Sequence, residues 1–163
     1  MATALKNLSK YDSDKVPTAE GMKIGILVSE WNQDVTFALR DGTVSTLLKH
    51  NVKEDNINVD YVPGTFELTA GAKILAKSGK YDAIVVIGCV IQGDTRHFDF
   101  ICNGVTQGIT QLNLDFEIPF IFCVLTTDNL QQALDRAGGI HGNKGDEAAI
   151  TAIKMIDLAK RNI

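Results

Sequence analysis

An unbroken apolar run at residues 83–87, followed by GCVIQGDTRHFDF at 88–100, constrains the fold of this chain more than any other stretch. A run without polar alternation is typical of a strand that is covered on both faces, as in a parallel sheet between two layers of helices. The Gly-Asp-Thr turn at 93–95 then opens a helix, so free backbone N–H groups lie at the carboxyl edge of the sheet. Because open α/β sheets bind ligands at this edge and a helix N-terminus favours an anion, we expect an anion site beside His97.

Strands and helices alternate along the rest of the chain. We expect strands at 22–28, 57–62, 81–88 and 118–125. The first three helices are expected from Asn32 or Asp34 to about 49, at 66–78 and at 98–114. A fourth helix is expected from a cap at Asp128, with Gln131 reaching back, to a stop at 138–139, and a fifth from 143–146 onward. With right-handed crossovers this order predicts a three-layer α/β/α sandwich, flavodoxin-like, with a parallel four-stranded sheet and helices on both faces. Residues 22–163 are expected to form one domain. The polar residues 1–21 are expected to form an N-terminal arm against a neighbouring subunit, or a disordered tail in an isolated chain.

Composition narrows the function classes. The 163 residues carry 16 Lys plus Arg and 20 Asp plus Glu, a net charge of -4 without a basic cluster, which argues against nucleic acid as the main partner. Three cysteines in apolar surroundings, without a C-x-x-C pair, indicate reduced thiols rather than a metal site or disulfides. Neither a signal peptide nor a membrane span is recognisable, so we expect a soluble cytoplasmic protein.

Two glycines, Gly104 and Gly108, interrupt the apolar residues of the helix expected after His97. Glycine lowers helix propensity, so their presence predicts close packing against a neighbouring element.

Four side chains near the expected sheet edge are candidates for chemistry, each with a structural alternative. His97 can exchange protons near neutral pH, or can be a histidine that only caps or hydrogen-bonds. Trp31 can stack on a planar heterocycle, or can be a lid over the core or an interface anchor. Glu67 can accept hydrogen bonds from hydroxyls, or can stabilise a helix N-terminus. Arg136 can clamp a phosphate, or can stabilise the end of a short helix.

Several long motifs together resemble the 6,7-dimethyl-8-ribityllumazine synthase family. They are SEWN at 29–32, VPGTFEL at 62–68, KYDAIVVIGCVIQGDTRHFDF at 80–100, IPFIFCVLTTDNLQQALDRAG at 118–138 and GNKG at 142–145. The resemblance implies a transferase of riboflavin biosynthesis that condenses 5-amino-6-(D-ribitylamino)uracil with 3,4-dihydroxy-2-butanone 4-phosphate. It implies no cofactor and no metal, and a homopentamer or an icosahedral capsid of pentamers, in which adjacent subunits share the active site.

The resemblance also assigns roles to individual residues. His97 matches the proton-transfer residue, and Phe122 matches an aromatic that reaches the site from the adjacent subunit. The remaining matches are Trp31, Asn32, Thr65, Phe66, Glu67, Val90 and Ile91 at the pyrimidine and ribityl chain, and Gly93, Asp94, Thr95 and Arg136 at the phosphate.

Some positions depart from the pattern of the family. Asp94 stands where a small uncharged residue is frequent, and a carboxylate there repels phosphate unless it is turned away. Gln92 and Ile140 stand where basic residues are frequent. Two other hypotheses compete with the enzyme: a catalytically silent relative that binds ligands or forms a cage, and a flavodoxin-like module that binds a flavin.

Overall fold

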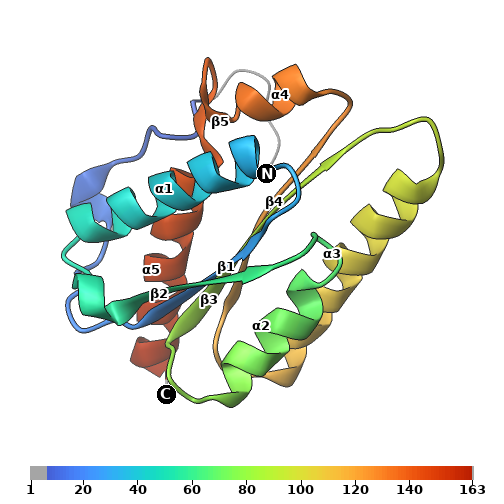
Figure 1. The fold of residues 1–163 in the computed structure, drawn as a ribbon. Helices are drawn as coiled ribbons and strands as arrows, with labels where there is room; N and C mark the ends of the chain where they lie inside the picture. The colour runs from blue at the N-terminus through green and yellow to red at the C-terminus, as the bar shows by residue number, and fades with distance from the viewer. Residues whose placement is uncertain (1–6, 163) are drawn as a thin grey trace.

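The computed structural model describes residues 7–162, whose main sheet has four parallel strands in the order β2-β1-β3-β4 (Figure 1). The strands are β1 (Ile24–Ser29), β2 (Ile57–Val62), β3 (Ala83–Ile91) and β4 (Phe120–Thr127). Ile24 of β1 is in register with Ile57 of β2 on one side and with Ala83 of β3 on the other. The strand order therefore reverses between β1 and β3, which is the point where sheets of this kind open a crevice.

Helices cover both faces of this sheet, which confirms the predicted three-layer α/β/α sandwich (Figure 1). One layer holds α1 (Gln33–Lys49) and α5 (Lys144–Asn162), and the other holds α2 (Leu68–Lys77) and α3 (His97–Asp115). The shorter elements are α4 (Leu130–Leu134), the 3-10 helices η1 (Ser13–Lys15) and η2 (Glu54–Asn56), and a hairpin of β5 (Ala137–Gly139) and β6 (Gly142–Asn143). No helix within residues 7–162 combines the length and the apolar character that crossing a membrane requires.

The apolar side chains of the strands divide between two cores. Ile26 and Val85 pack beneath α1 and α5, whereas Leu27 and Val86 pack beneath α2 and α3. Because successive side chains of a strand point to opposite faces, a strand that serves both cores must be apolar at nearly every position. This is the physical reason for the unbroken run at 83–87.

Strand β3 is longer at its carboxyl end than predicted: it ends at Ile91 and not at Gly88. The extension is stabilised by β4, where Ile91 pairs with Thr127 and the backbone N–H of Gln92 donates to the Thr127 carbonyl at 2.8 Å. Val90 and Ile91 are therefore strand residues at the carboxyl edge.

The predicted capping of the fourth helix is wrong by one residue. Asn129, not Asp128, is the N-cap, and its Oδ1 accepts from the backbone N–H of Gln132 at 2.9 Å. Gln132, not Gln131, reaches back to accept from the N–H of Asp128 at 3.0 Å. The helix also ends at Leu134, before the predicted stop at 138–139, because the β5–β6 hairpin starts immediately after Arg136.

The described part of the N-terminal arm lies against its own chain, and residues 1–6 lie outside the described range. The N–H of Leu8 donates to the carbonyl of His141 at 2.7 Å, and the Ser9 hydroxyl accepts from the N–H of Asn143 at 2.9 Å. The arm therefore runs beside the β5–β6 hairpin.

The close packing predicted at the two glycines is confirmed. A Cβ atom at Gly104 would press on the ring of Phe66, and one at Gly108 would collide with the side chain of Thr69. The absence of these Cβ atoms lets α3 approach α2 closely.

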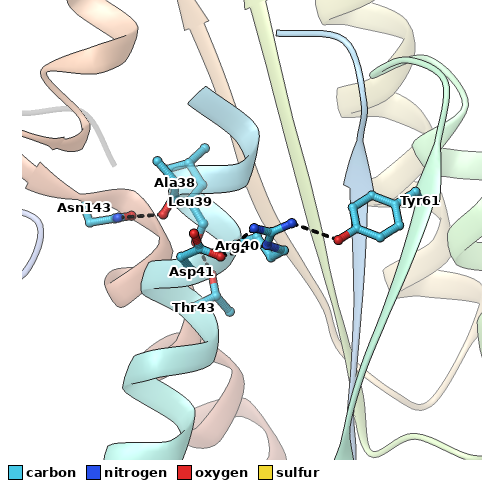
Figure 2. A network of polar contacts seen from close by, with 7 residues as sticks. All are labelled: Ala38, Leu39, Arg40, Asp41, Thr43, Tyr61 and Asn143. Atoms are coloured by element: carbon cyan, nitrogen blue, oxygen red, sulfur yellow. Dashed lines mark hydrogen bonds and ion pairs between the residues drawn. The ribbon is translucent and has the colours of Figure 1, made fainter. Parts of the chain in front are cut away.

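Asn143 links three elements through its side chain. Its Nδ2 donates to the Ala38 carbonyl of α1 at 2.9 Å (Figure 2), and its Oδ1 accepts from the N–H of Gly145 at 2.7 Å. Figure 2 also shows a link from α1 to the sheet, where Nη1 of Arg40 donates to the Tyr61 hydroxyl of β2 at 2.8 Å.

Replacing Asn143 with Ala should lower the free energy of unfolding by about 2 kcal/mol, because the partly buried N–H of Gly145 loses its acceptor and the Ala38 carbonyl loses a side-chain donor. The matched control is Asn58→Ala, whose amide donates to the Tyr81 hydroxyl at an exposed position, and whose loss should cost about 0.5 kcal/mol or less. Urea unfolding followed by circular dichroism, at equal protein concentration, measures both. Equal losses would contradict the linking role of Asn143.

Candidate active site

A cavity of about 670 Å³ opens at the carboxyl edge of the sheet, where the loops after β1, β2 and β3 meet. We call it the site cavity. The predicted site residues that line it are Trp31, Asn32, Thr65, Phe66, Glu67, Val90, Ile91, Gly93, Thr95 and His97. Parallel strands bring the loops together at this edge, which is why residues distant in the sequence converge here.

The loop after β1 is held to β3 by Asn32. The residue is in the left-handed conformation (φ 61°, ψ 44°), and its Nδ2 donates to the Cys89 carbonyl at 2.9 Å. The predicted side-chain cap of α1 by Asn32 is therefore not formed, because the amide is directed to β3 instead. Asparagine adopts this conformation more readily than most residues. The hydrogen bond from Asn32 to Cys89 therefore fixes the backbone next to Trp31.

Trp31 is 73% exposed within the single chain, so it is not a lid over the core. Its backbone N–H donates to the Pro63 carbonyl at 3.1 Å, which joins the first loop to the second. An exposed indole that borders a cavity is suited to stacking on a flat ligand or to contact with another chain.

The loop after β2 supplies a buried anchor and an exposed wall. Thr65 is 5% exposed, and its hydroxyl donates to the Cys89 carbonyl at 3.4 Å, the oxygen that also accepts from Asn32. The next residue, Phe66, is 56% exposed and lines the cavity. Glu67 is the N-cap of α2 but makes no side-chain cap bond, and it lines the cavity as well.

The loop after β3 places His97 at the first position of α3, where it is exposed and lines the site cavity. Its backbone N–H donates to the Thr95 hydroxyl at 3.4 Å. Gly93 and Thr95 line the cavity, but Asp94 between them does not. Asp94 is exposed and is not part of the cavity lining.

Sequence reasoning missed some of the apolar lining. Phe98 and Ile101 of α3 border the site cavity, together with Cys89 and Gly64. The spacing of Ile101, four residues after His97, puts both on one helix face and was the available signal. Burial raises the pKa of the Cys89 thiol to about 12, so this cysteine is not a thiolate nucleophile at neutral pH.

Two predicted site residues, Phe122 and Arg136, lie outside the site cavity. They line a second cavity of about 880 Å³ along the edge strand β4, which we call the edge cavity. Nη1 of Arg136 donates to the Gln132 carbonyl at 2.8 Å, so one end of the guanidinium stabilises the end of α4. Lys144 also lines the edge cavity, where its ammonium pairs with Glu147 at 2.7 Å.

The predicted site residues are distributed over two cavities that offer different chemical groups. The site cavity combines aromatic walls, a histidine and a helix N-terminus, which suits a flat polar ligand and an anion. The edge cavity contributes an aromatic ring and basic groups. Within residues 7–162, no group of three or more His, Cys, Asp or Glu residues is arranged to hold a metal ion.

Comparison with known proteins gives a consistent family. The family model described as 6,7-dimethyl-8-ribityllumazine synthase matches residues 21–160. A protein of that name from Parabacteroides distasonis is 60% identical over 159 residues, covering 98% of this chain and 99% of its own. Those from Phocaeicola vulgatus and Porphyromonas gingivalis are 58% and 57% identical, covering 99% and 98% of this chain and 96% and 99% of their own.

Two substitutions separate the roles of Asn32. Asn32→Gly removes the bond to Cys89 but tolerates positive φ, and should lower the free energy of unfolding by about 1–2 kcal/mol. Asn32→Ala loses the same bond and strains the backbone, which should cost about 1 kcal/mol more. Urea unfolding of both variants measures the difference. Equal losses would mean that the left-handed conformation at residue 32 carries no strain.

Proposed function

The chain belongs to the 6,7-dimethyl-8-ribityllumazine synthase family, and we propose that its reaction takes place in the site cavity. The enzyme is a transferase that condenses 5-amino-6-(D-ribitylamino)uracil with 3,4-dihydroxy-2-butanone 4-phosphate, the penultimate step of riboflavin biosynthesis. The observation that carries the proposal is the convergence of three loops, from β1, β2 and β3, on one cavity with His97 at its rim.

In this proposal, the pyrimidine lies against the aromatic wall. Trp31 stacks on the ring, and Phe66 closes the opposite side as an apolar surface. Val90 and Ile91, at the end of β3, border the ring edge. Glu67 accepts hydrogen bonds from the ribityl hydroxyls, because a carboxylate is a strong acceptor and its position borders the same cavity.

His97 moves protons during the condensation. The amine of the pyrimidine attacks the ketone and forms a Schiff base with loss of water, phosphate is eliminated, and ring closure by the ribitylamino nitrogen expels water again. Each step transfers a proton, and a histidine is suited to both giving and taking protons near neutral pH. Much of the rate enhancement is assigned to holding the two substrates side by side.

The phosphate occupies the N-terminus of α3. The turn at Gly93 and Thr95 borders the cavity, and the first backbone N–H groups of a 19-residue helix favour a dianion. This placement requires the exposed Asp94 carboxylate to point away from the phosphate, and Asp94 is not part of the cavity lining. Arg136 supplies the remaining positive charge, since a guanidinium binds phosphate through two nitrogens.

Arg136 and Phe122 reach the site from an adjacent subunit in this proposal. Both lie on the edge cavity of their own chain, so a neighbour whose β4 edge faces the site cavity would bring them to it. Exposed large apolar side chains on α2 and α3 support an oligomer that covers them: Ile74, Phe100 and Leu114 are 70%, 73% and 76% exposed. We assign a homopentamer, assembled into an icosahedral capsid because the link at 138–145 is short.

The proposed location is the cytoplasm. All three cysteines are free thiols, and burial raises the pKa of each. Unpaired cysteines are typical of a reducing compartment.

Replacing His97 with Ala should slow product formation roughly 100-fold, because a positioned acid–base group contributes about that much. The measurement is the absorbance of the lumazine product after mixing the enzyme with both substrates. The matched control is His50→Ala, whose ring contacts Tyr11 away from the cavity, and whose rate should stay close to that of the unmodified chain.

Three outcomes are informative. A rate unchanged by His97→Ala would remove this residue from the mechanism and leave orientation as the main contribution. Absence of product from the unmodified chain would favour a cage-forming relative instead. Absence of product together with a tightly bound yellow chromophore would favour a flavin-binding module.

Mixing two impaired variants, assayed at a concentration of the butanone phosphate well below the KM of Arg136→Ala, tests the shared site. His97→Ala and Arg136→Ala subunits, co-expressed in equal amounts, place an intact His97 beside an intact Arg136 in roughly one quarter of the sites of a random ring. Activity should therefore recover to about a quarter of normal, relative to the two variants alone. Arg136→Ala by itself should raise the KM for the butanone phosphate far more than the KM for the pyrimidine. Without recovery in the mixture, both residues would have to act within one chain.

A further inference from the structure

We infer that Gly104 of α3 is a positioning residue, which sets the width of the pyrimidine pocket by supporting the Phe66 ring from behind. The inference rests on the proposed role of the site cavity and goes beyond it, because Gly104 itself does not line the cavity. It concerns the position of the Phe66 ring in the cavity wall and not the identity of the substrate.

The contact between Gly104 and Phe66 has no spare room. A Cβ atom built on Gly104 would lie 3.0 Å from Cε2 and 3.5 Å from Cδ2 of the Phe66 ring. Ordinary contacts between carbon atoms lie at about 3.5–4.0 Å. Any side chain at residue 104 must therefore push the edge of the ring away from α3.

The Phe66 backbone is anchored by buried residues on both sides of it, so the side chain is the part that is free to move. Thr65 is buried over Gly88, where a Cβ atom would lie 2.8 Å from the Thr65 hydroxyl. Leu68 is fully buried in the α2–α3 core. The ring can rotate about its own side-chain bonds, because Phe66 is 56% exposed, and the residue lines the cavity. Displacement from α3 therefore narrows or reshapes the cavity.

The glycine is not required by the backbone of α3. Gly104 lies inside a continuous α-helix from His97 to Asp115, a conformation that alanine adopts more favourably than glycine. The helix thus gives up intrinsic stability at residue 104. The structural gain is the space that the Phe66 ring occupies.

Gly108 provides a matched comparison one turn further along the same helix. A Cβ atom there would collide with Thr69 of α2, which does not line the site cavity. Both glycines lie in the α2–α3 seam, but only Gly104 touches a residue of the cavity wall. A general loosening of the seam should therefore follow from Gly108→Ala at least as strongly as from Gly104→Ala.

The test compares Gly104→Ala, Gly108→Ala, Phe66→Leu and the double variant Phe66→Leu/Gly104→Ala in the intact oligomer. Gly104→Ala should raise the KM for the pyrimidine roughly 3- to 10-fold, because small displacements of a positioning wall are costly. The KM for the butanone phosphate should stay within about two-fold of normal, since its phosphate is proposed to bind at the N-terminus of α3 and not against the Phe66 ring. The melting temperature should be unchanged or higher, because alanine favours the helix.

The other variants identify the cause. Phe66→Leu should raise the KM for the pyrimidine, and adding Gly104→Ala should raise it no further, because the shorter side chain no longer meets the new methyl group. Gly108→Ala should lower the melting temperature and leave the KM for the pyrimidine close to normal.

Distinct results overturn the inference or its premise. If Phe66→Leu raises the KM for the pyrimidine but Gly104→Ala does not, Gly104 does not set the ring position. The inference is also overturned if Gly104→Ala raises the KM for the pyrimidine equally with and without Phe66→Leu, because the Phe66 ring is then not the cause. It is overturned as well if Gly104→Ala and Gly108→Ala raise this KM equally, because the cause is then a general change in the packing of α3. If Phe66→Leu leaves the KM for the pyrimidine unchanged, the proposed pyrimidine site is wrong and the inference falls with it.

Discussion

The parallel pairing of β1 with β3 is the contact on which the rest of this structure depends. It lies where the strand order reverses, so the loops that follow the two strands separate and leave space between them. The amide of Asn32 and the hydroxyl of Thr65 meet at the carbonyl of Cys89, which ties the loops after β1 and β2 to β3. One backbone oxygen is thus the common reference point for the walls of the site cavity.

The architecture was predictable because burial on two faces leaves a simple sequence pattern. Runs such as 83–87 must be apolar throughout, and helices such as α2 and α5 carry an apolar stripe, so element types and their order follow directly. Local details that depend on geometry did not follow. The cap at Asn129 was misplaced by one residue, and the β5–β6 hairpin was missed because its two short strands have no periodicity of their own.

The site was predictable where topology alone brings residues together. Trp31, Phe66 and His97 follow three parallel strands, and parallel strands end at one edge, so their convergence required no knowledge of side-chain contacts. The side-chain direction of Asn32 was not predictable, because a capping residue and a residue bonded to a neighbouring strand have the same sequence appearance. The separation of Phe122 from His97 within one chain was implied only by family resemblance, and the separation of Arg136 from His97 was not predicted.

The N-terminal arm has a consequence for how this chain can vary. Leu8 and Ser9 hydrogen-bond to the β5–β6 hairpin, and a Cβ atom at Gly142, which has a φ of +77°, would collide with Asn7. The hairpin directly follows Arg136, so the contacts with the N-terminal arm also hold the segment that carries Arg136. Insertions in the hairpin and changes of length in the arm cannot be accommodated independently, and relatives that alter one segment should carry compensating changes in the other.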